Sequence, residues 1–204
     1  MDPRLSSPAA RRNRDPILAV LRRVLPAEGT VLELGSGTGE HAAWFGAHLP
    51  GLEFQPSDPE PANRASIAAW IAHERLANVR APLALDVLDE DWALPAEVAS
   101  RLVAVLSLNM IHVAPWQAAL GLLHGAARVL RPGGVLYLYG PFKREGRHTA
   151  PSNAAFDASL RAHDPAWGVR DLEDVAAAAG RYGFLFADVV QMPANNLSAI
   201  FRKT

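Results

Sequence analysis

The stretch VLELGSGTGEH, residues 31–41, constrains the fold more than any other part of the chain. An apolar run leads directly into glycines at alternate positions, Gly35, Gly37 and Gly39, and an acid follows. Glycine lets the backbone adopt positive φ values and approach a ligand closely. A helix that starts directly after such a turn points its free N–H groups at the same place. The stretch therefore predicts a strand, a ligand-binding turn and a helix in succession.

The alternation of strand and helix continues along the chain. Apolar runs predict buried strands at residues 30–34, 52–58, 81–87, 101–109 and 135–142. Amphipathic or apolar periodicity predicts helices at residues 15–25, 39–49, 61–76, 116–130 and 171–182. The last residues, 184–204, contain two β-rich runs separated by MPANN, which is typical of a hairpin. This order predicts a doubly wound, Rossmann-like α/β sheet that ends in an antiparallel hairpin.

The length of 204 residues predicts one domain, residues 1–204. Within it, residues 1–14 are expected to form an N-terminal arm, because Asp15 and Pro16 suit the N-cap and first position of the helix that follows. Residues 141–170 interrupt the alternation with Pro, Gly, His and Asn but keep apolar residues. This segment is expected to be an insertion over the substrate site.

Composition excludes several classes of function. A net charge of -1 gives no broad basic surface for nucleic acid. No apolar run reaches the ~18 residues that span a bilayer, and the start of the chain lacks the apolar centre of a signal peptide. There is no cysteine and no closely spaced histidine pair, so no metal site is expected. We expect a cytoplasmic protein whose partner is a small molecule, and the sequence does not indicate its oligomeric state.

The glycine turn is not that of the common phosphate-binding loops. A P-loop would need Gly-Lys-Ser/Thr, which is absent. A dinucleotide turn, Gly-x-Gly-x-x-Gly, would have its third glycine one residue later, where Glu40 stands. A pyrophosphate beside Glu33 and Glu40 would meet like charge, whereas a ligand with a cationic amine or sulfonium would not.

Acids at the next strand ends narrow the ligand further. In a doubly wound sheet, ligands bind outside the carboxyl ends of the strands. Asp58 follows the second predicted strand and suits the two hydroxyls of a ribose, and Asp86 follows the third and suits an adenine amino group. With Glu33 at the first strand, acids stand at three successive strand ends. This pattern describes a nucleoside-like ligand that is bound without phosphate recognition, and S-adenosylmethionine is that ligand.

The sequence resembles the class I S-adenosylmethionine-dependent methyltransferases over about residues 15–204. The resemblance rests on VLELGSGTGEH, Asp58, LDV at 85–87, LNMIH at 108–112 and RVLRPGGVLYLYGPF at 128–142. RN at 12–13, SNAAFDASL at 152–160, DPAWGVRDLEDV at 164–175 and MPANNLSAIFRK at 192–203 look like a little-characterised methyltransferase-like subfamily that has carried a domain-of-unknown-function label. The resemblance implies a seven-stranded sheet and S-adenosylmethionine as cofactor, and it leaves the acceptor open.

The resemblance also implies the residues of the cofactor site. In the family pattern, Glu33 orients the methionine end, Asp58 holds the ribose and Asp86 holds the adenine. The alternative for Glu33 is a residue that only braces the turn by hydrogen bonds. The full set of expected cofactor residues is Glu33, Gly35, Ser36, Gly37, Gly39, His41, Asp58, Asp86, Val87, Asn109 and Met110.

Catalytic and acceptor residues are less sharply defined. His112 follows the fourth predicted strand, where it is either a general base or a neutral histidine bonded to backbone, and Tyr139 closes the fifth. The expected acceptor-binding residues are Arg12, Asn13, Lys143, Asn153, Trp167, Arg170, Asn195 and Asn196. Several have simpler alternatives: a mobile tail for the first two, cap core for Trp167, an Arg170–Asp171 pair that caps a helix, and a hairpin turn for the last two.

Methyl transfer is an in-line displacement, and alignment in a dry pocket can supply much of its rate without a dedicated base. The sequence therefore predicts a methyltransferase acting on an oxygen, nitrogen or sulfur of a small molecule. Two alternatives remain open at this level: a cofactor-binding regulatory protein that has lost transfer, and a nicotinamide-dependent reductase. Glu40 and the terminal hairpin argue against the reductase.

Overall fold

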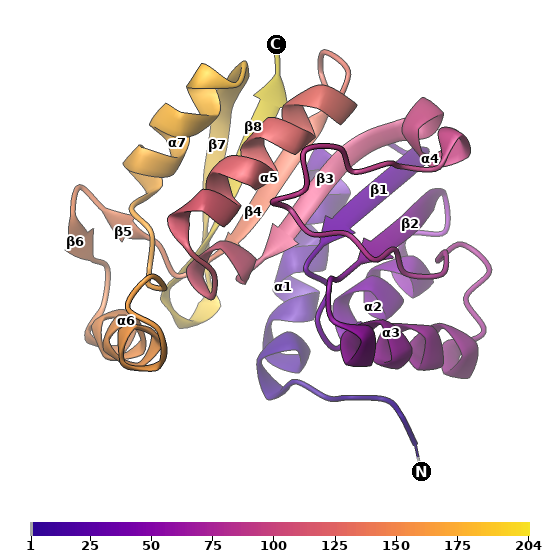
Figure 1. The fold of residues 1–204 in the computed structure, drawn as a ribbon, viewed down its shortest axis with the longest axis horizontal. Coiled ribbons are helices and arrows are strands. Elements are labelled where there is room, and N and C mark those ends of the chain that lie inside the picture. The colour runs from indigo at the N-terminus through magenta and orange to yellow at the C-terminus, as the bar shows by residue number, and fades with distance from the viewer. Residues whose placement is uncertain (1) are drawn as a thin grey trace. The chain divides into compact units, whose positions relative to one another are not determined.

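The computed structural model describes residues 2–204, so Met1 of the predicted arm lies outside the described residues. The chain forms two compact units. Unit 1 comprises the residues up to Asp86 together with residues 92–106, and unit 2 comprises residues 87–91 and 107–204. Six strands form one sheet in the order β2-β1-β3-β4-β8-β7 (Figure 1). The predicted α/β class with a terminal antiparallel hairpin is confirmed.

The elements of unit 1 are α1 (Pro8–Val24), β1 (Gly29–Leu34), α2 (Glu40–His48), β2 (Leu52–Ser57), α3 (Pro61–Glu74) and α4 (Ala96–Arg101). β3 (Leu102–Leu108) begins in unit 1 and ends in unit 2. The elements of unit 2 are the 3-10 helix η1 (Met110–His112), α5 (Trp116–Val129), β4 (Val135–Gly140), β5 (Lys143–Arg144), β6 (Arg147–His148), α6 (Pro151–His163), α7 (Leu172–Arg181), β7 (Phe184–Met192), the 3-10 helix η2 (Pro193–Asn195) and β8 (Asn196–Lys203).

In unit 1, β1 and β2 are parallel, and all six residues of β1 are buried. α2 packs on β2, with α1 and α3 against α2. The first helix starts earlier than predicted, because Ser7 rather than Asp15 is its N-cap and Pro8 rather than Pro16 stands in its first turn. Residues 8–14 of the predicted arm are therefore helical, and Pro16 lies inside the helix.

The third predicted strand, residues 81–87, is wrong as a strand. Residues 78–83 follow β2 through four backbone hydrogen bonds, but they form only two isolated parallel bridges, Phe54 with Val79 and Ser57 with Leu83. Pro56 of β2 lies between the two bridges and has no N–H to donate to a continuous ladder. The sheet consequently has six strands where the resemblance implied seven.

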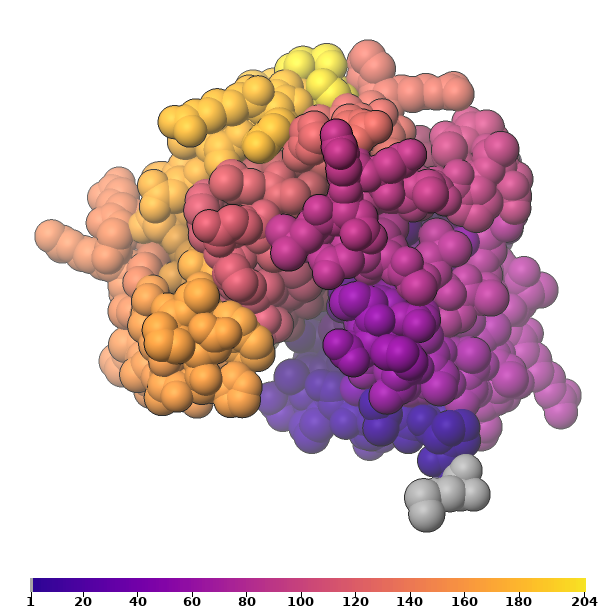
Figure 2. Space-filling view, in the orientation of Figure 1, coloured from indigo at the N-terminus to yellow at the C-terminus, as the bar shows by residue number. Residues whose placement is uncertain are grey.

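In unit 2, β8 runs antiparallel to both β4 and β7. β4 is buried along its whole length, and its Tyr137 hydroxyl bonds Ser198 of β8 at 2.6 Å. α5 and α7 pack side by side and lie over the same face of these strands (Figure 1). Residues 141–170, predicted as an insertion, fold into the β5–β6 hairpin and α6, and α6 is exposed at the surface in orange in Figure 2.

Across residues 2–204, no helix has the length and hydropathy needed to cross a bilayer. The same residues contain no group of three or more histidine, aspartate and glutamate side chains that could hold a metal ion.

Candidate cofactor site and insertion

The glycine turn joins β1 to α2 with all three glycines in the left-handed region, at φ 65° for Gly35, 55° for Gly37 and 86° for Gly39. Hydrogen bonds hold the turn to the end of β2. The Ser36 N–H donates to the Ser57 carbonyl at 2.9 Å, and the Gly37 N–H donates to the Asp58 carboxylate at 2.9 Å. The turn is therefore a fixed structure at the carboxyl ends of two parallel strands.

Gly37 and Gly39 are glycines for different reasons. A Cβ on Gly37 would meet no atom within 4 Å, so this position faces open space. A Cβ on Gly39 would lie 2.8 Å from the Cα of Ile67 in α3, which is closer than such atoms come. Gly39 thus lets α2 and α3 pack closely, a reason separate from its predicted cofactor role.

Asp58 is buried and braces the site. Besides the Gly37 N–H, its carboxylate accepts the Glu60 N–H at 3.0 Å and the Asn63 side-chain amide at 3.1 Å. Each carboxylate oxygen can accept two hydrogen bonds. The Oδ1 atom has both of its bonds, whereas Oδ2 has only the bond from Gly37 and can accept one more.

Glu33 is a second buried acid in unit 1 and is 2% exposed. Its Oε2 atom has no hydrogen-bond partner among the described residues. Burial raises the pKa of Glu33 to about 7; a hydrogen bond with Ser36 opposes the rise, and the negative charge of Asp58 adds to it. A buried carboxyl without a partner is costly to ionise, and a ligand that brings a positive charge or a donor would offset that cost.

Glu40 and His41, at the start of α2, face α1. Glu40 accepts hydrogen bonds from the Ser7 N–H and from Arg11 Nε, the latter at 2.9 Å. His41 Nε2 lies 2.7 Å from Asn13 Oδ1, and burial lowers the pKa of His41 to about 4. These contacts attach α1 to α2, and they are structural bonds that sequence reasoning did not assign.

The remaining predicted cofactor residues follow β2 and β3 in the chain. Asp86 is half-buried in unit 1. Val87 is buried in unit 2, where its carbonyl lies so close to Gly121 that a Cβ there would be 2.4 Å away. Asn109 has a φ of 63° and donates its N–H to the Tyr139 carbonyl at 2.7 Å, and Met110 begins η1.

His112 is fully buried, and its bonds are to backbone. Its Nδ1 accepts the Arg170 N–H at 3.2 Å, and its carbonyl accepts the Gly168 N–H at 2.9 Å. The ring packs edge-on against Phe142, and Nε2 has no partner within residues 2–204. Burial, and then the charge of Arg170, lower the pKa of His112 to about 3, so the ring is neutral. Of the two alternatives for His112, this geometry favours a neutral histidine bonded to backbone.

Replacing Gly140 by Ala is expected to destabilise the protein by about 1–3 kcal/mol, because overpacking a filled core forces neighbours to move. The new Cβ would lie 2.3 Å from His112 Nε2, and both residues are buried. Chemical denaturation measures the loss. Gly180→Ala is the control, since a Cβ on this exposed residue of α7 meets nothing within 4 Å. A combined Gly140→Ala, His112→Ala variant should be less unstable than the sum of the two changes; strict additivity would contradict the clash.

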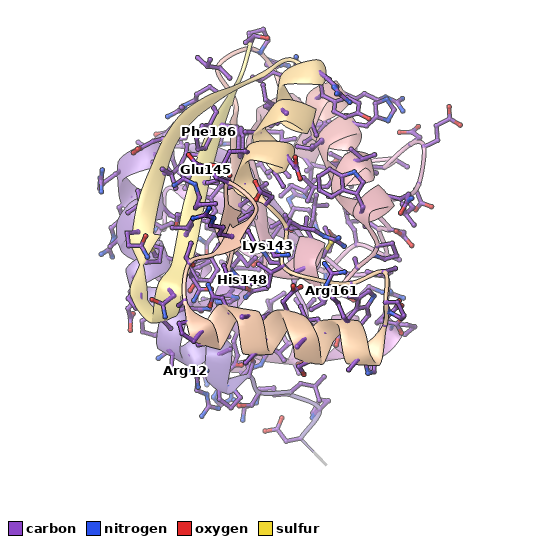
Figure 3. The ribbon with its side chains drawn as sticks, turned by 90° about the vertical axis from the view of Figure 1, so that its left-hand side faces the viewer. Arg12, Lys143, Glu145, His148, Arg161 and Phe186 are labelled. Carbon is purple, nitrogen blue, oxygen red and sulfur yellow. The ribbon has the colours of Figure 1, made fainter. Side chains whose placement is uncertain are left out.

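Asp157 is the centre of the insertion; the sequence places it near the acceptor side with the rest of the insertion but does not single it out as a site residue. It is 6% exposed and accepts the Val169 N–H at 2.7 Å. Three cationic or titratable groups contact it: Lys143 at 3.3 Å, His148 at 3.2 Å and Arg161 at 3.2 Å. Figure 3 shows these three side chains gathered above α6. The available signal was the spacing of Asn153, Asp157 and Leu160, which puts two polar residues on the buried face of a helix.

Most predicted acceptor residues make contacts within the protein. Asn153 is buried and donates to the Thr149 hydroxyl and the Asn195 carbonyl. Asn195, at φ 58°, and Asn196 form the hairpin turn, as their simpler alternative proposed. The Trp167 ring lies 5.0 Å from the His163 ring, centre to centre, and is tilted by 41° against it.

Arg170 does not pair with Asp171; its guanidinium donates to three backbone carbonyls instead, those of Ile111, Ala114 and Ala166. Asp171 does cap α7, by accepting the Glu173 N–H. Arg12 is exposed on α1, and Lys143 forms an ion pair with Asp157.

Comparison with solved structures identifies the fold. The mitomycin 7-O-methyltransferase MmcR superposes with a TM-score of 0.80 at 15% identity, over 96% of this chain and 54% of that one. An O-methyltransferase family protein from Burkholderia thailandensis gives 0.77 at 19%, over 96% and 57%. Human N-acetylserotonin methyltransferase, solved with S-adenosylmethionine, gives 0.74 at 16%, over 96% and 52%. This chain spans about half the length of these methyltransferases and shares their fold.

A family model covers almost all of the chain, from residue 4 to residue 203, and its description is "Protein of unknown function (DUF938)". That description names no substrate, in agreement with the resemblance to a little-characterised methyltransferase-like subfamily. With a match of this extent and a methyltransferase fold, the chain belongs to the DUF938 family of proteins of unknown function.

Proposed function

We propose that this protein is an S-adenosylmethionine-dependent methyltransferase that moves a methyl group to an oxygen, nitrogen or sulfur atom of a small molecule. The fold shared with solved methyltransferases supports the reaction class. The observation that carries the cofactor assignment is the pair of buried acids, Glu33 and Asp58, beside a glycine turn that is open at Gly37.

The donors and acceptors around that turn fit S-adenosylmethionine better than a phosphate ligand. Glu33 Oε2 lacks a partner, and Asp58 Oδ2 can accept one more hydrogen bond. A phosphate would bring further negative charge toward two carboxyl groups, which costs energy at short range. S-adenosylmethionine would bring an ammonium and a sulfonium group, which carry positive charge, and ribose hydroxyls, which donate hydrogen bonds. Glu33 Oε2 and Asp58 Oδ2 have room for such partners.

Glu33, Gly37 and Asp58 would hold the cofactor, and Asp86 would bind its adenine. The bound cofactor would supply an electrophilic methyl group, with a neutral thioether as the leaving group. The protein's part is then to align the acceptor with that methyl group and to exclude water. The acceptor atom forms the new bond to carbon, and any proton that it carries passes to solvent.

No dedicated base is required by this scheme, and His112 is poorly suited to be one. Its pKa is about 3, and its Nδ1 already accepts the Arg170 N–H. We propose that His112 positions the backbone of residues 168–170. Tyr139, whose side chain is 2% exposed, likewise positions Asn109 through its carbonyl.

Calorimetric titration of the purified protein with S-adenosylmethionine, S-adenosylhomocysteine and NAD tests the cofactor assignment. We expect the first two to bind and NAD not to bind. Absence of binding for both sulfur nucleosides would overturn the proposed function.

Asp58→Ala is expected to weaken the binding of S-adenosylhomocysteine by about 1–3 kcal/mol, because a buried donor of the ligand would lose its acceptor. Asn63→Ala is the matched control: it removes one of the bonds that brace Asp58 but keeps the carboxylate. We expect its affinity to stay near that of the wild type. An unchanged affinity of Asp58→Ala would refute the ribose assignment, and an equal loss in both variants would assign Asp58 to bracing alone.

A further inference from the structure

Unit 2 contains a pocket of its own, with a volume of about 610 Å³, in the range of small-molecule sites. Its walls come from α5, β5, α6, α7 and the segment that precedes α7. Trp116, Leu120 and Ala178 provide apolar surface. Every residue that lines this pocket lies in unit 2, so its geometry does not depend on the glycine turn.

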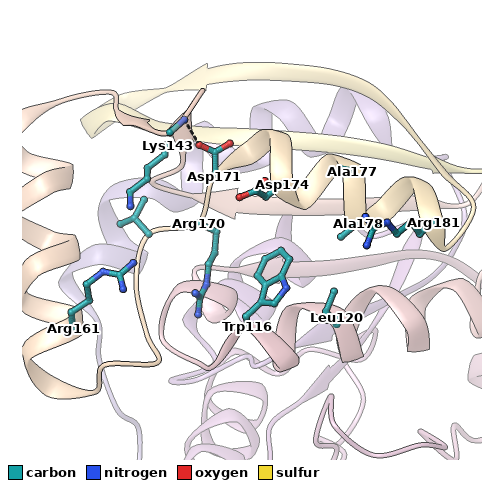
Figure 4. A pocket seen from close by; sticks show the side chains of 12 residues that line it. Trp116, Leu120, Lys143, Arg161, Arg170, Asp171, Asp174, Ala177, Ala178 and Arg181 are labelled. Atoms are coloured by element: carbon teal, nitrogen blue, oxygen red, sulfur yellow. Dashed lines mark hydrogen bonds between the residues drawn. The ribbon is translucent and has the colours of Figure 1, made fainter.

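Cationic side chains from three different segments come together at one end of this pocket. Figure 4 shows the ends of Lys143, Arg161 and Arg170 there, and Arg181 at the other end. The one carboxylate that pairs with Lys143 and Arg161 is that of Asp157. Three positive charges against one negative charge leave two in excess, and like charges this close repel.

Arg170 differs from Lys143 and Arg161 in its partners. Its guanidinium donates only to the carbonyls of Ile111, Ala114 and Ala166, and within residues 2–204 it forms no ion pair. Burial lowers the pKa of Arg170, the charge of Arg161 lowers it further, and the charge of Asp157 opposes the shift. A guanidinium that is partly buried, held rigidly and not engaged in an ion pair is a good partner for a planar anion.

Two acids also line the pocket, Asp174 and Asp171, and Asp171 follows Arg170 directly and forms a β-bridge with Lys143. Asp171 accepts the Glu173 N–H at 3.1 Å and the Gly146 N–H at 2.5 Å. Asp174 lies one helical turn away from it along α7. The Asp171 carboxylate is thus engaged by backbone donors, and among the described residues it forms no ion pair with Lys143, Arg161 or Arg170.

Trp116 lies next to this end, since the Arg170 guanidinium is 5.8 Å from the centre of its ring. An aromatic ring could stack on Trp116 while an acid group attached to it meets Arg170. We propose that this pocket is a binding site for a small aromatic anion, with the acid group held by Lys143, Arg161 and Arg170 and the ring held by Trp116.

Titration calorimetry of the full chain with 4-hydroxybenzoate tests the site, with 4-hydroxybenzamide as the neutral analogue. We expect the carboxylate to bind at least about tenfold more tightly than the amide, as one or more charge-assisted hydrogen bonds would give. Phenyl phosphate and inorganic phosphate are the further probes. Tighter binding of phenyl phosphate than of 4-hydroxybenzoate would identify the acid group as a phosphate; tighter binding of 4-hydroxybenzoate would identify it as a carboxylate. If inorganic phosphate bound as tightly as phenyl phosphate, the role of the ring would be overturned.

Lys143→Gln and Arg161→Gln should each weaken binding of 4-hydroxybenzoate by about tenfold. Arg147→Gln is the matched control, because Arg147 is an exposed cation of the same insertion that does not line the pocket. Trp116→Leu should weaken the binding of 4-hydroxybenzoate more than that of inorganic phosphate. Circular dichroism and melting curves establish that each variant is folded. Equal binding of carboxylate and amide, or an equal loss in Arg147→Gln, would overturn the proposal whether or not the protein binds S-adenosylmethionine.

Discussion

Glu33→Gln is expected to stabilise the unliganded protein by about 3 kcal/mol at pH 8 and to leave its stability unchanged at pH 4. The reason is the pKa of Glu33, which burial raises from 4.5 to about 7. Between about pH 4.5 and pH 7, Glu33 of the folded protein keeps a proton that the unfolded chain has released. The stability of the wild type therefore falls, relative to the variant, as pH rises from about 4.5 to about 7, and the difference is constant above that pH.

Chemical denaturation at several pH values from 4 to 8 measures this difference. Glu60→Gln is the control, because Glu60 is an exposed acid in the same unit and its side chain caps nothing. We expect the control to follow the wild type at every pH. A stability difference between wild type and Glu33→Gln that does not grow between pH 4.5 and 7 would contradict a protonated Glu33.

The same substitution should weaken the binding of S-adenosylmethionine. If an ionised Glu33 faces the methionine end of the cofactor, binding expels its proton below pH 7, and the affinity of the wild type rises with pH through that region. The affinity of Glu33→Gln should lack this rise. A variant that is both more stable and weaker in binding is the pattern of a site kept at a cost in stability. Unchanged affinity would leave Glu33 with the bracing role alone.

Asp157→Ala is expected to destabilise the protein by about 3 kcal/mol, since removing one partner of a buried ion pair leaves the others uncompensated. Lys143, His148 and Arg161 would lose their shared acid, and the Val169 N–H would lose its acceptor. Chemical denaturation at pH 7 measures the loss. Asp164→Ala is the control, because this residue of the same segment bonds only the Ala166 N–H. Equal effects of the two substitutions would contradict the central role of Asp157.

The contribution of Asp157 also depends on pH. Burial tends to raise its pKa, but the Val169 N–H and Lys143 outweigh burial and hold the pKa below its usual value of 3.8. The stabilisation is therefore fully present above pH 3.8 and is lost as pH falls through the lower pKa of the folded state. The difference between wild type and Asp157→Ala should shrink in that acidic range.

Local sequence patterns were sufficient where the interactions are local. The turn at Gly35, Gly37 and Gly39 could be predicted because positive φ favours glycine. Strands such as β1 and β4 could be predicted because a fully apolar run must be buried on both faces. The hairpin at Asn195 followed from the same backbone preferences.

Contacts between distant segments were not readable in the same way. The strand expected at residues 81–87 is reduced to a bridge at Leu83, beside a strand whose Pro56 lacks an N–H for the ladder. The first helix begins at Pro8 rather than Pro16, with Ser7 bonded to Glu40 of α2. Both segments contact partners that lie far away in the chain.

The sequence by itself determined the α/β class, the glycine turn, and the position of two acids, Glu33 and Asp58, at the ends of the first two strands. Only the tertiary structure decided which partner each polar group bonds. His112 is buried and accepts a backbone N–H, Asp157 contacts three cationic or titratable side chains, and Arg170 donates to carbonyl rather than carboxylate groups. The physical reason is that periodicity and backbone preference fix which residues are buried, whereas the protonation and pairing of a buried polar group depend on neighbours brought to it by folding.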